Sequence, residues 1–198
     1  EKQQRILNAA MIEFAAKGFD DASTNSIVEG AGISKGLLFH YFKSKRQLFF
    51  YLYDRSIQLF LDQFYQKMDM EEQDLFAKLH KILLVKMELV RKHPGIMEFL
   101  KAAYLEDSHA VKQEMDDHNK DLINQNIARV FENIDRTRFR RDVDADKVIH
   151  TVVWAFEGYS NDFLRKAAKQ PAGEIDYDGM FADARRYVEF LKQCFYEE

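Results

Sequence analysis

A short polar segment, Ser34-Lys35-Gly36, has the residue types that hold an anion at the start of a helix. A serine in this position caps the helix, and the free backbone N–H groups of the first turn give it a positive field. The lysine adds a charge, and the glycine lets the backbone approach an anion closely. The segment therefore predicts a contact with a phosphate group.

The segments around this site predict how it is positioned. Residues 24–49 indicate two short helices, a tight turn at Gly32 that favours positive φ, and a third helix. Ser44 and Gln47 have the spacing of a capping box, so the third helix should begin at Lys45. Apolar residues at helical spacing would hold the two short helices on a core: Ile27, Val28, Ala31, Leu38 and Phe42. This pattern is a helix-turn-helix, which suggests that the phosphate belongs to DNA.

The outer side of the second short helix supplies the candidates for DNA contact. Leu37 could touch a thymine methyl group, and His40 could meet either a base edge or a phosphate. Tyr41 could donate its hydroxyl to phosphate or pack into the small core. The predicted DNA-binding residues are Thr24, Asn25, Ser34, Lys35, Gly36, Leu37, His40, Tyr41 and Lys45.

The distribution of charge agrees with DNA binding although the chain is acidic, with a formal net charge of -4. Residues 33–46 contain four basic and no acidic residues, and residues 1–47 contain seven basic against five acidic ones. Charges act over only about 8–10 Å at physiological salt, so a local basic face can attract phosphates on an acidic protein.

These motifs together resemble the tetracycline-repressor (TetR) family of bacterial transcription regulators. The resemblance covers about the first quarter of the chain and rests on Gly18-Phe19, Thr24, Ile27, the run from Ala31 to Gly36, and the run from Leu38 to Lys45. Ala22 and Phe39 depart from the residues that the family often has there, so a hydroxyl contact to phosphate is lacking at each. The resemblance implies a homodimer that binds an inverted-repeat operator and releases it when a small effector binds.

The remaining chain predicts an all-α fold, because helical apolar patterns are long and the only prolines, Pro94 and Pro171, fall at expected helix boundaries. We expect a three-helix head at 1–47 and a ligand-binding and dimerisation domain of about six helices at 48–198. The first helix should span about Gln3 to Lys17 and end at Gly18. Later helices are expected at 45–67, 75–93, 96–105, 108–134, from Asp142 or Asp144 to about Ala168, and at 177–195.

The last two helices have wide apolar faces, which predicts that they pack against their copies in a second chain. The alternative is a helix that is fully buried within one monomer. The predicted dimer residues are Val152, Tyr159, Phe163, Phe181, Ala184, Val188, Leu191 and Phe195.

Large flexible apolar side chains in the middle of the chain suit a cavity for a small apolar or amphipathic effector, although ordinary core packing explains each of them as well. Polar residues among them could orient the effector. The predicted ligand-binding residues are Phe64, Met68, Met87, Met97, Tyr104, Met115, His118, Trp154, Glu157 and Asn161.

Several other kinds of site and location are not indicated. Cys194 is the only cysteine, so no disulfide within the chain or Cys-based zinc site is expected, and a reducing bacterial cytoplasm fits. The sequence has no stretch of about 18 apolar residues and no secretory leader. Glu114 and His118 could share a metal with Asp107 or His109, but such pairs are common, and we expect neither metal nor cofactor.

The sequence thus predicts a ligand-responsive DNA-binding regulator, most often a repressor in the family it resembles, and not an enzyme. Motifs of common hydrolases and metalloproteases are missing. One alternative is a helical DNA-binding or partner-binding protein without an inducer. The other is an enzyme that uses the apolar cavity.

Overall fold

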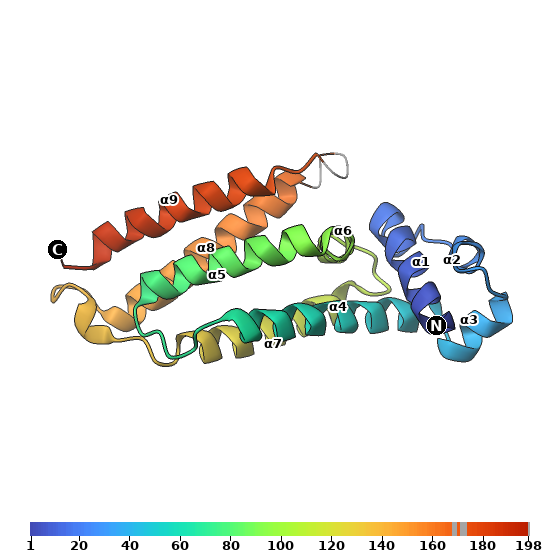
Figure 1. Cartoon of the computed structure of the whole chain (residues 1–198), viewed down its shortest axis with the longest axis horizontal. Coiled ribbons are helices and arrows are strands. Elements are labelled where there is room, and N and C mark those ends of the chain that lie inside the picture. Colours follow the sequence, from blue (N-terminus) through green and yellow to red (C-terminus); the bar gives the residue numbers. More distant parts are fainter. Residues whose placement is uncertain (168–169, 171–173, 198) are drawn as a thin grey trace. The chain divides into compact units, whose positions relative to one another are not determined.

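The computed structural model describes residues 1–167, 170 and 174–197, and for residues 121–124 it describes the backbone only. Within this part of the chain the predicted all-α fold is confirmed, with a three-helix head followed by further helices (Figure 1). The helices are α1 (Lys2–Lys17), α2 (Thr24–Ala31), α3 (Lys35–Tyr41), α4 (Lys45–Lys67), α5 (Leu75–Lys92), α6 (Pro94–Tyr104), α7 (Lys112–Phe131), the 3-10 helix η1 (Arg136–Arg138), α8 (Ala145–Ala167) and α9 (Tyr177–Phe195).

The predicted caps of the helix-turn-helix are present. Gly18 ends α1 with φ 68°, and Gly32 ends α2 with φ 61°, in the left-handed region that favours glycine. The Ser34 hydroxyl accepts a hydrogen bond from the Leu37 N–H at 3.3 Å, and Ser44 accepts one from Gln47 at 3.1 Å. These local bonds satisfy N–H groups that a helix start leaves free, so α3 and α4 begin where the sequence predicts.

Two helices begin at other residues than predicted, and for a third the structure decides between the two predicted capping residues. Helix α6 begins at Pro94 because a proline, which lacks an N–H, suits the first helical turn. Helix α7 begins at Lys112, four residues later than expected. Asp144 caps α8 by accepting hydrogen bonds from two backbone N–H groups, whereas Asp142 pairs with Arg140. The predicted end of α8 at Ala168 lies outside the described residues.

The chain forms two compact units, and two of the boundaries between them fall within helices. The first contains Glu1–Asp62 and His93–His118, and the second contains Gln63–Lys92 and the chain from Asn119 onward. Helices α4 and α7 therefore each begin in the first unit and end in the second. The predicted division at residue 47 concerns function and remains a prediction, whereas packing adds α6 and the start of α7 to the head.

The core of the first unit is aromatic and includes a residue from α6. Phe14 of α1 meets Phe49 of α4 edge-on with ring centroids 5.1 Å apart, and Phe99 of α6 meets Phe49 edge-on at 5.7 Å. All three side chains are fully buried. Such ring pairs contribute about 0.5–1.5 kcal/mol each beyond the burial of their surface. Helix α6 thus completes the core on which the helix-turn-helix rests.

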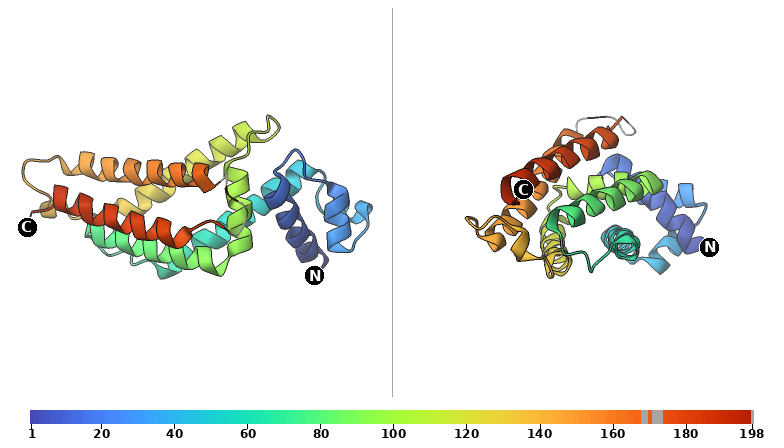
Figure 2. Two further views of the ribbon diagram at one scale, coloured as in Figure 1. Left: turned by 90° about the horizontal axis from the view of Figure 1, so that it is seen from above. Right: turned by 60° about the vertical axis from the view of Figure 1, so that its left-hand side comes forward.

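The second unit is a set of long helices in which α5 and α8 both pack along α9 (Figure 2). Its core joins Leu75 and Phe76 of α5 to Val152 of α8 and Val188 of α9. Lys78 of α5 is also fully buried, and its ammonium group donates hydrogen bonds to the carbonyl oxygens of Met70 and Val130 and to the side chain of Asn133. These three hydrogen bonds offset part of the free-energy cost of burying the charge.

Candidate functional site

The N-terminal end of α3 is open to solvent on the side away from the core. Leu38, at 1% exposure, holds α3 on the core, while Ser34, Lys35 and Gly36 are exposed and Leu37 is half-buried. A side chain added at Gly36 would meet no atom within 4 Å. The backbone of the first turn is therefore accessible from outside, which is the geometry needed for a close approach of phosphate to N–H groups.

Lys35 is held at this surface by a residue of the preceding helix. Its ammonium group donates a hydrogen bond to the side-chain oxygen of Asn25 at 2.9 Å. Two predicted DNA-binding residues are thus brought together, one from α2 and one from α3, whereas Thr24 beside them is half-buried. The ammonium keeps further N–H donors for an anion.

The aromatic residues at the end of α3 face outward. His40 is exposed, and Tyr41 is 42% exposed with its ring edge-on to His40 at 5.7 Å. Of the two alternatives for Tyr41, this position agrees with a hydroxyl that reaches an external partner. Phe39 is also exposed, at 39%, so an apolar ring stands where a hydroxyl is often found in the family resembled.

Lys45 has a structural role that the sequence did not suggest. Its ammonium group donates to the carbonyl oxygens of Asp20 and Ala22 at 2.9 and 3.1 Å, and it lies 4.7 Å from the centre of the Phe19 ring. Lys45 therefore fastens the turn between α1 and α2 to the start of α4. A phosphate contact from this residue, which remains a prediction, would have to use its remaining N–H donor.

Glu106, which was not predicted as a functional residue, holds the same turn. It is buried in the loop between α6 and α7, and its carboxylate accepts a hydrogen bond from the backbone N–H of Phe19. The neighbouring Ser108 donates its hydroxyl to Asp20 at 2.7 Å. Glu106 is followed by the polar residues Asp107 and Ser108, and nothing in this local sequence identifies a partner so distant along the chain.

The predicted ligand-binding residues do not form one group. Met97, Tyr104, Met115 and His118 belong to the first unit, and the others belong to the second. Met115 is 2% exposed within the aromatic core, and His118 lies outside, with its ring nitrogen 3.3 Å from Asp54. Met115 therefore packs in the core, and His118 lies at the surface.

In the second unit, the predicted ligand-binding residues also differ in burial. Phe64 and Met87 are half-buried, Met68 is 8% exposed, and Asn161 is half-buried. Glu157 is exposed, and Trp154 is 68% exposed on the side of α8 opposite the core residue Val152. Trp154 thus suits an outer surface better than an enclosed cavity.

Half of the predicted dimer residues are covered by the chain's own helices. Val152, Phe181, Ala184 and Val188 are at most 5% exposed within this single chain. The others are half-buried: Tyr159, Phe163, Leu191 and Phe195. Val148 and Ile149, near the start of α8, also lie in the core of the second unit. Contact of the predicted dimer residues with a second chain remains a prediction.

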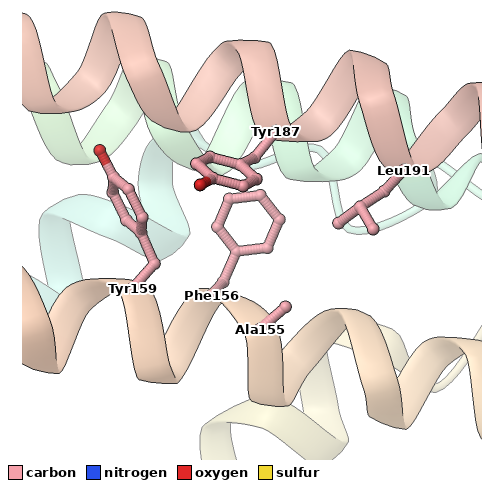
Figure 3. A pocket seen from close by; sticks show the side chains of 5 residues that line it. All are labelled: Ala155, Phe156, Tyr159, Tyr187 and Leu191. Carbon is pink, nitrogen blue, oxygen red and sulfur yellow. The ribbon is translucent and has the colours of Figure 1, made fainter.

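A different set of apolar side chains is open on α8 and α9. Tyr187 and Phe190 of α9 are 49% and 59% exposed, and Trp154 of α8 is exposed as described. Between the two helices lies a groove of about 220 Å³, lined by Ala155, Phe156, Tyr159, Tyr187 and Leu191 (Figure 3). Tyr159 donates its hydroxyl to the Met180 carbonyl at 3.0 Å, which ties one wall of the groove to the other.

The described residues contain no cluster of three His, Cys, Asp or Glu side chains that could hold a metal ion. Glu114 pairs with Arg46 instead of sharing a site with His118. No helix in the described part of the chain is long and apolar enough to cross a membrane.

Comparisons with known proteins cover both parts of the chain. Residues 6–52 match the family model described as bacterial regulatory proteins, tetR family, and residues 73–195 match that of the tetracyclin repressor-like C-terminal domain. An HTH-type transcriptional regulator of Bacillus subtilis, YfiR, is 24% identical over 98% of this chain and 93% of its own length. The nucleoid occlusion factor SlmA of Haemophilus ducreyi is 28% identical over 50% of each chain.

Solved structures agree with the fold. SmeT, the repressor of the Stenotrophomonas maltophilia multidrug efflux pump SmeDEF, superposes with a TM-score of 0.72 at 14% identity, over 99% of this chain and 91% of that one. A tetR family transcription regulator from Shewanella sp. PV-4 gives a TM-score of 0.66 at 20% identity over the whole of both chains. With an open helix-turn-helix at its N-terminus and a family match that spans most of its length, this chain belongs to the TetR family of transcriptional regulators.

Proposed function

We propose that this protein is a repressor that binds an inverted-repeat operator as a homodimer and releases it when a small apolar or amphipathic effector binds the second unit. The proposal rests above all on the open start of α3. Ser34, Lys35 and Gly36 are exposed there, and the sequence from 33 to 46 has four basic residues and no acidic one. Two such helices would enter successive major grooves, about 34–36 Å apart.

Two observations support repression and effector release. The fold is similar to that of SmeT, which is a repressor, and helix α4 runs without a break from the first unit into the second. Helix α4 begins beside α3 and ends in the second unit, so a change in the second unit can reach the head through one continuous helix. An effector acts in this way only if it binds the DNA-free conformation more tightly than the DNA-bound one. DNA then weakens effector binding by the same factor.

The homodimer is supported by the open surface of α8 and α9. Trp154 of α8 and Tyr187 and Phe190 of α9 are exposed apolar side chains, and a side chain added at Gly158 would meet no atom within 4 Å. A residue without a side chain allows another helix to approach closely. A second copy that packs its α8 and α9 here would form a four-helix interface and cover these rings.

DNA binding is tested by selecting bound duplexes from a random pool and titrating the selected operator at several salt concentrations. Lys35→Ala should weaken binding and reduce the log-log salt slope by about one unit, because one phosphate contact is lost. Lys112→Ala is the control, since Lys112 lies on α7 and pairs with Asp116. An unchanged slope for Lys35→Ala would place this residue away from DNA.

The dimer is tested by light scattering after size-exclusion chromatography. Phe190→Glu should convert the protein to a monomer, because a charge in an apolar interface stays without a partner. Ile12→Glu is the matched control, since Ile12 is an exposed apolar residue of α1 in the first unit, at 72% exposure. If Phe190→Glu remains a dimer, the two copies meet elsewhere.

A further inference from the structure

Lys86 lies on the side of α5 that faces the interior of the second unit. On a helix, residues three and four positions away share a face, which for Lys86 means Ile82, Leu83, Leu89 and Val90. Ile82 and Leu83 are half-buried and pack against the core of this unit, and Leu89 and Val90 are 2% and 8% exposed. The side chain of Lys86 therefore leaves the helix toward the interior.

Lys86 is nevertheless exposed to solvent. Exposure is ordinary for a lysine on an outer face, but here the neighbours on the same face are buried or half-buried. Because protein interiors are closely packed, an inward side chain stays accessible only where a space large enough for water lies beside it. Desolvation lowers the pKa of Lys86, which agrees with an ammonium group inside the unit.

Lys78 provides the contrast on the same helix. It is fully buried, and three oxygen atoms accept hydrogen bonds from its ammonium group. Among the residues whose side chains the structure describes, Lys86 has no hydrogen bond or ion pair. The protein thus supplies acceptors for one inward lysine and leaves the donors of the other facing an accessible space.

We propose that Lys86 binds the carboxylate of an amphipathic organic anion whose apolar part packs inside the second unit. An ammonium group in a largely apolar interior lacks a compensating charge, and a ligand carboxylate supplies both the charge and the hydrogen-bond acceptors. The half-buried side chains of Ile82 and Leu83 offer apolar surface one turn away. This inference rests on the effector response proposed above and narrows it from an apolar or amphipathic effector to an amphipathic anion.

Displacement of a neutral fluorescent probe tests the inference on the full-length protein. N-phenyl-1-naphthylamine is bound first and then displaced by decanoate, decanol or decyltrimethylammonium, which share an apolar chain and differ in charge. We expect decanoate to displace the probe at about tenfold lower concentration than decanol, as a charge-assisted hydrogen bond supports. The cationic compound should be the weakest of the three.

Three variants show whether Lys86 causes this preference. Lys86→Met should keep probe and decanol binding and lose the advantage of decanoate, whereas Lys86→Arg should retain the advantage. Lys81→Met is the matched control, because Lys81 is an exposed lysine on the same helix. A thermal melt of each variant verifies that it is folded.

Other outcomes overturn the inference. A decanoate preference that persists in Lys86→Met, or that disappears equally in Lys81→Met, would place the anion elsewhere. If the wild-type protein binds neither the probe nor decanoate, the second unit has no internal space that accepts such a ligand. Operator binding is measured separately in the absence of any effector, so these failures leave the proposed DNA binding standing, and loss of DNA binding would leave this result unchanged.

Discussion

The carboxylate of Glu106 accepts a hydrogen bond from the backbone N–H of Phe19 at 2.5 Å, which joins the loop between α6 and α7 to the turn between α1 and α2. Its other oxygen accepts from the N–H groups of Asp107 and Ser108 at 3.1 and 2.9 Å. One buried side chain therefore organises two loops. The turn that precedes the helix-turn-helix is therefore held by a residue that lies outside that motif.

Glu106→Ala should lower the free energy of unfolding by about 2–3 kcal/mol, because buried N–H groups lose a charged acceptor. It should also weaken operator binding, since the turn before α2 loses a constraint. Urea unfolding and an operator titration measure the two effects.

Glu114→Ala is the control for Glu106→Ala. Glu114 pairs with Arg46 at the surface, and both side chains are 49% exposed, so this loss should cost less than about 1 kcal/mol. Equal stability losses in the two variants would mean that the buried carboxylate has no special role.

Gly36→Ala should separate stability from DNA binding. The added methyl group meets no atom of the protein, and alanine is favoured over glycine within a helix by about 0.5–1 kcal/mol, so unfolding should become slightly harder. Operator affinity should nevertheless fall, because the methyl group keeps phosphate away from the backbone. Thermal unfolding and an operator titration provide the comparison, and unchanged affinity would show that phosphate does not approach Gly36.

Two glycines with positive φ should respond differently to alanine. Gly18 has φ 68° and ψ -167°, a region open almost only to glycine, and an added Cβ would lie 3.0 Å from the Glu106 carboxylate. Gly32 has φ 61° and ψ 46°, and its nearest neighbour is a flexible arginine end at 3.6 Å.

Gly18→Ala should therefore destabilise the protein by about 1–3 kcal/mol, and Gly32→Ala by about 1–2 kcal/mol. Urea unfolding of both variants ranks them directly. The reverse order would contradict the conformational argument, since Gly18 carries both the less favourable backbone angles and the closer contact.

The helix-turn-helix was predictable because its determinants are local. Ser34 and Ser44 lie within three residues of the N–H groups that they cap, and Gly32 lies at the turn that it permits. Such short-range bonds can be inferred from spacing alone. The open face of α3 follows from the same pattern, since Leu38 fixes which side is buried.

Contacts between distant segments were not predictable from the same signals. Glu106 and Phe19 are 87 positions apart, and no local pattern pairs them. The wide apolar faces of α8 and α9 were visible in the sequence, but which stripe each helix buries against its neighbour depends on how the two helices pack. Lys86 interrupts an apolar stripe of α5, as Lys78 does, and the sequence does not show that the structure buries Lys78 among three oxygen acceptors and leaves Lys86 exposed.

Tyr53 should make the protein less stable in alkaline solution. Burial in the first unit raises its pKa from 10.0 to about 12, with a smaller contribution from the neighbouring charge of Asp54. Between pH 10 and about 12 the unfolded chain loses the phenolic proton and the folded chain keeps it. The stabilising preference for the protonated form is present at lower pH and is lost across this window, by up to about 1.4 kcal/mol per pH unit.

Tyr53→Phe removes this ionisation, so its free energy of unfolding should decline less steeply than that of the wild type above pH 10. Urea unfolding at several pH values between 9.5 and 11.5 measures the slopes, and the comparison of slopes is independent of any constant loss from the missing hydroxyl. Tyr51→Phe, which removes a hydroxyl from a residue that is 38% exposed on the same helix, should retain the wild-type slope. Identical slopes for wild type and Tyr53→Phe would mean that the Tyr53 hydroxyl ionises as easily in the folded protein as in the unfolded chain.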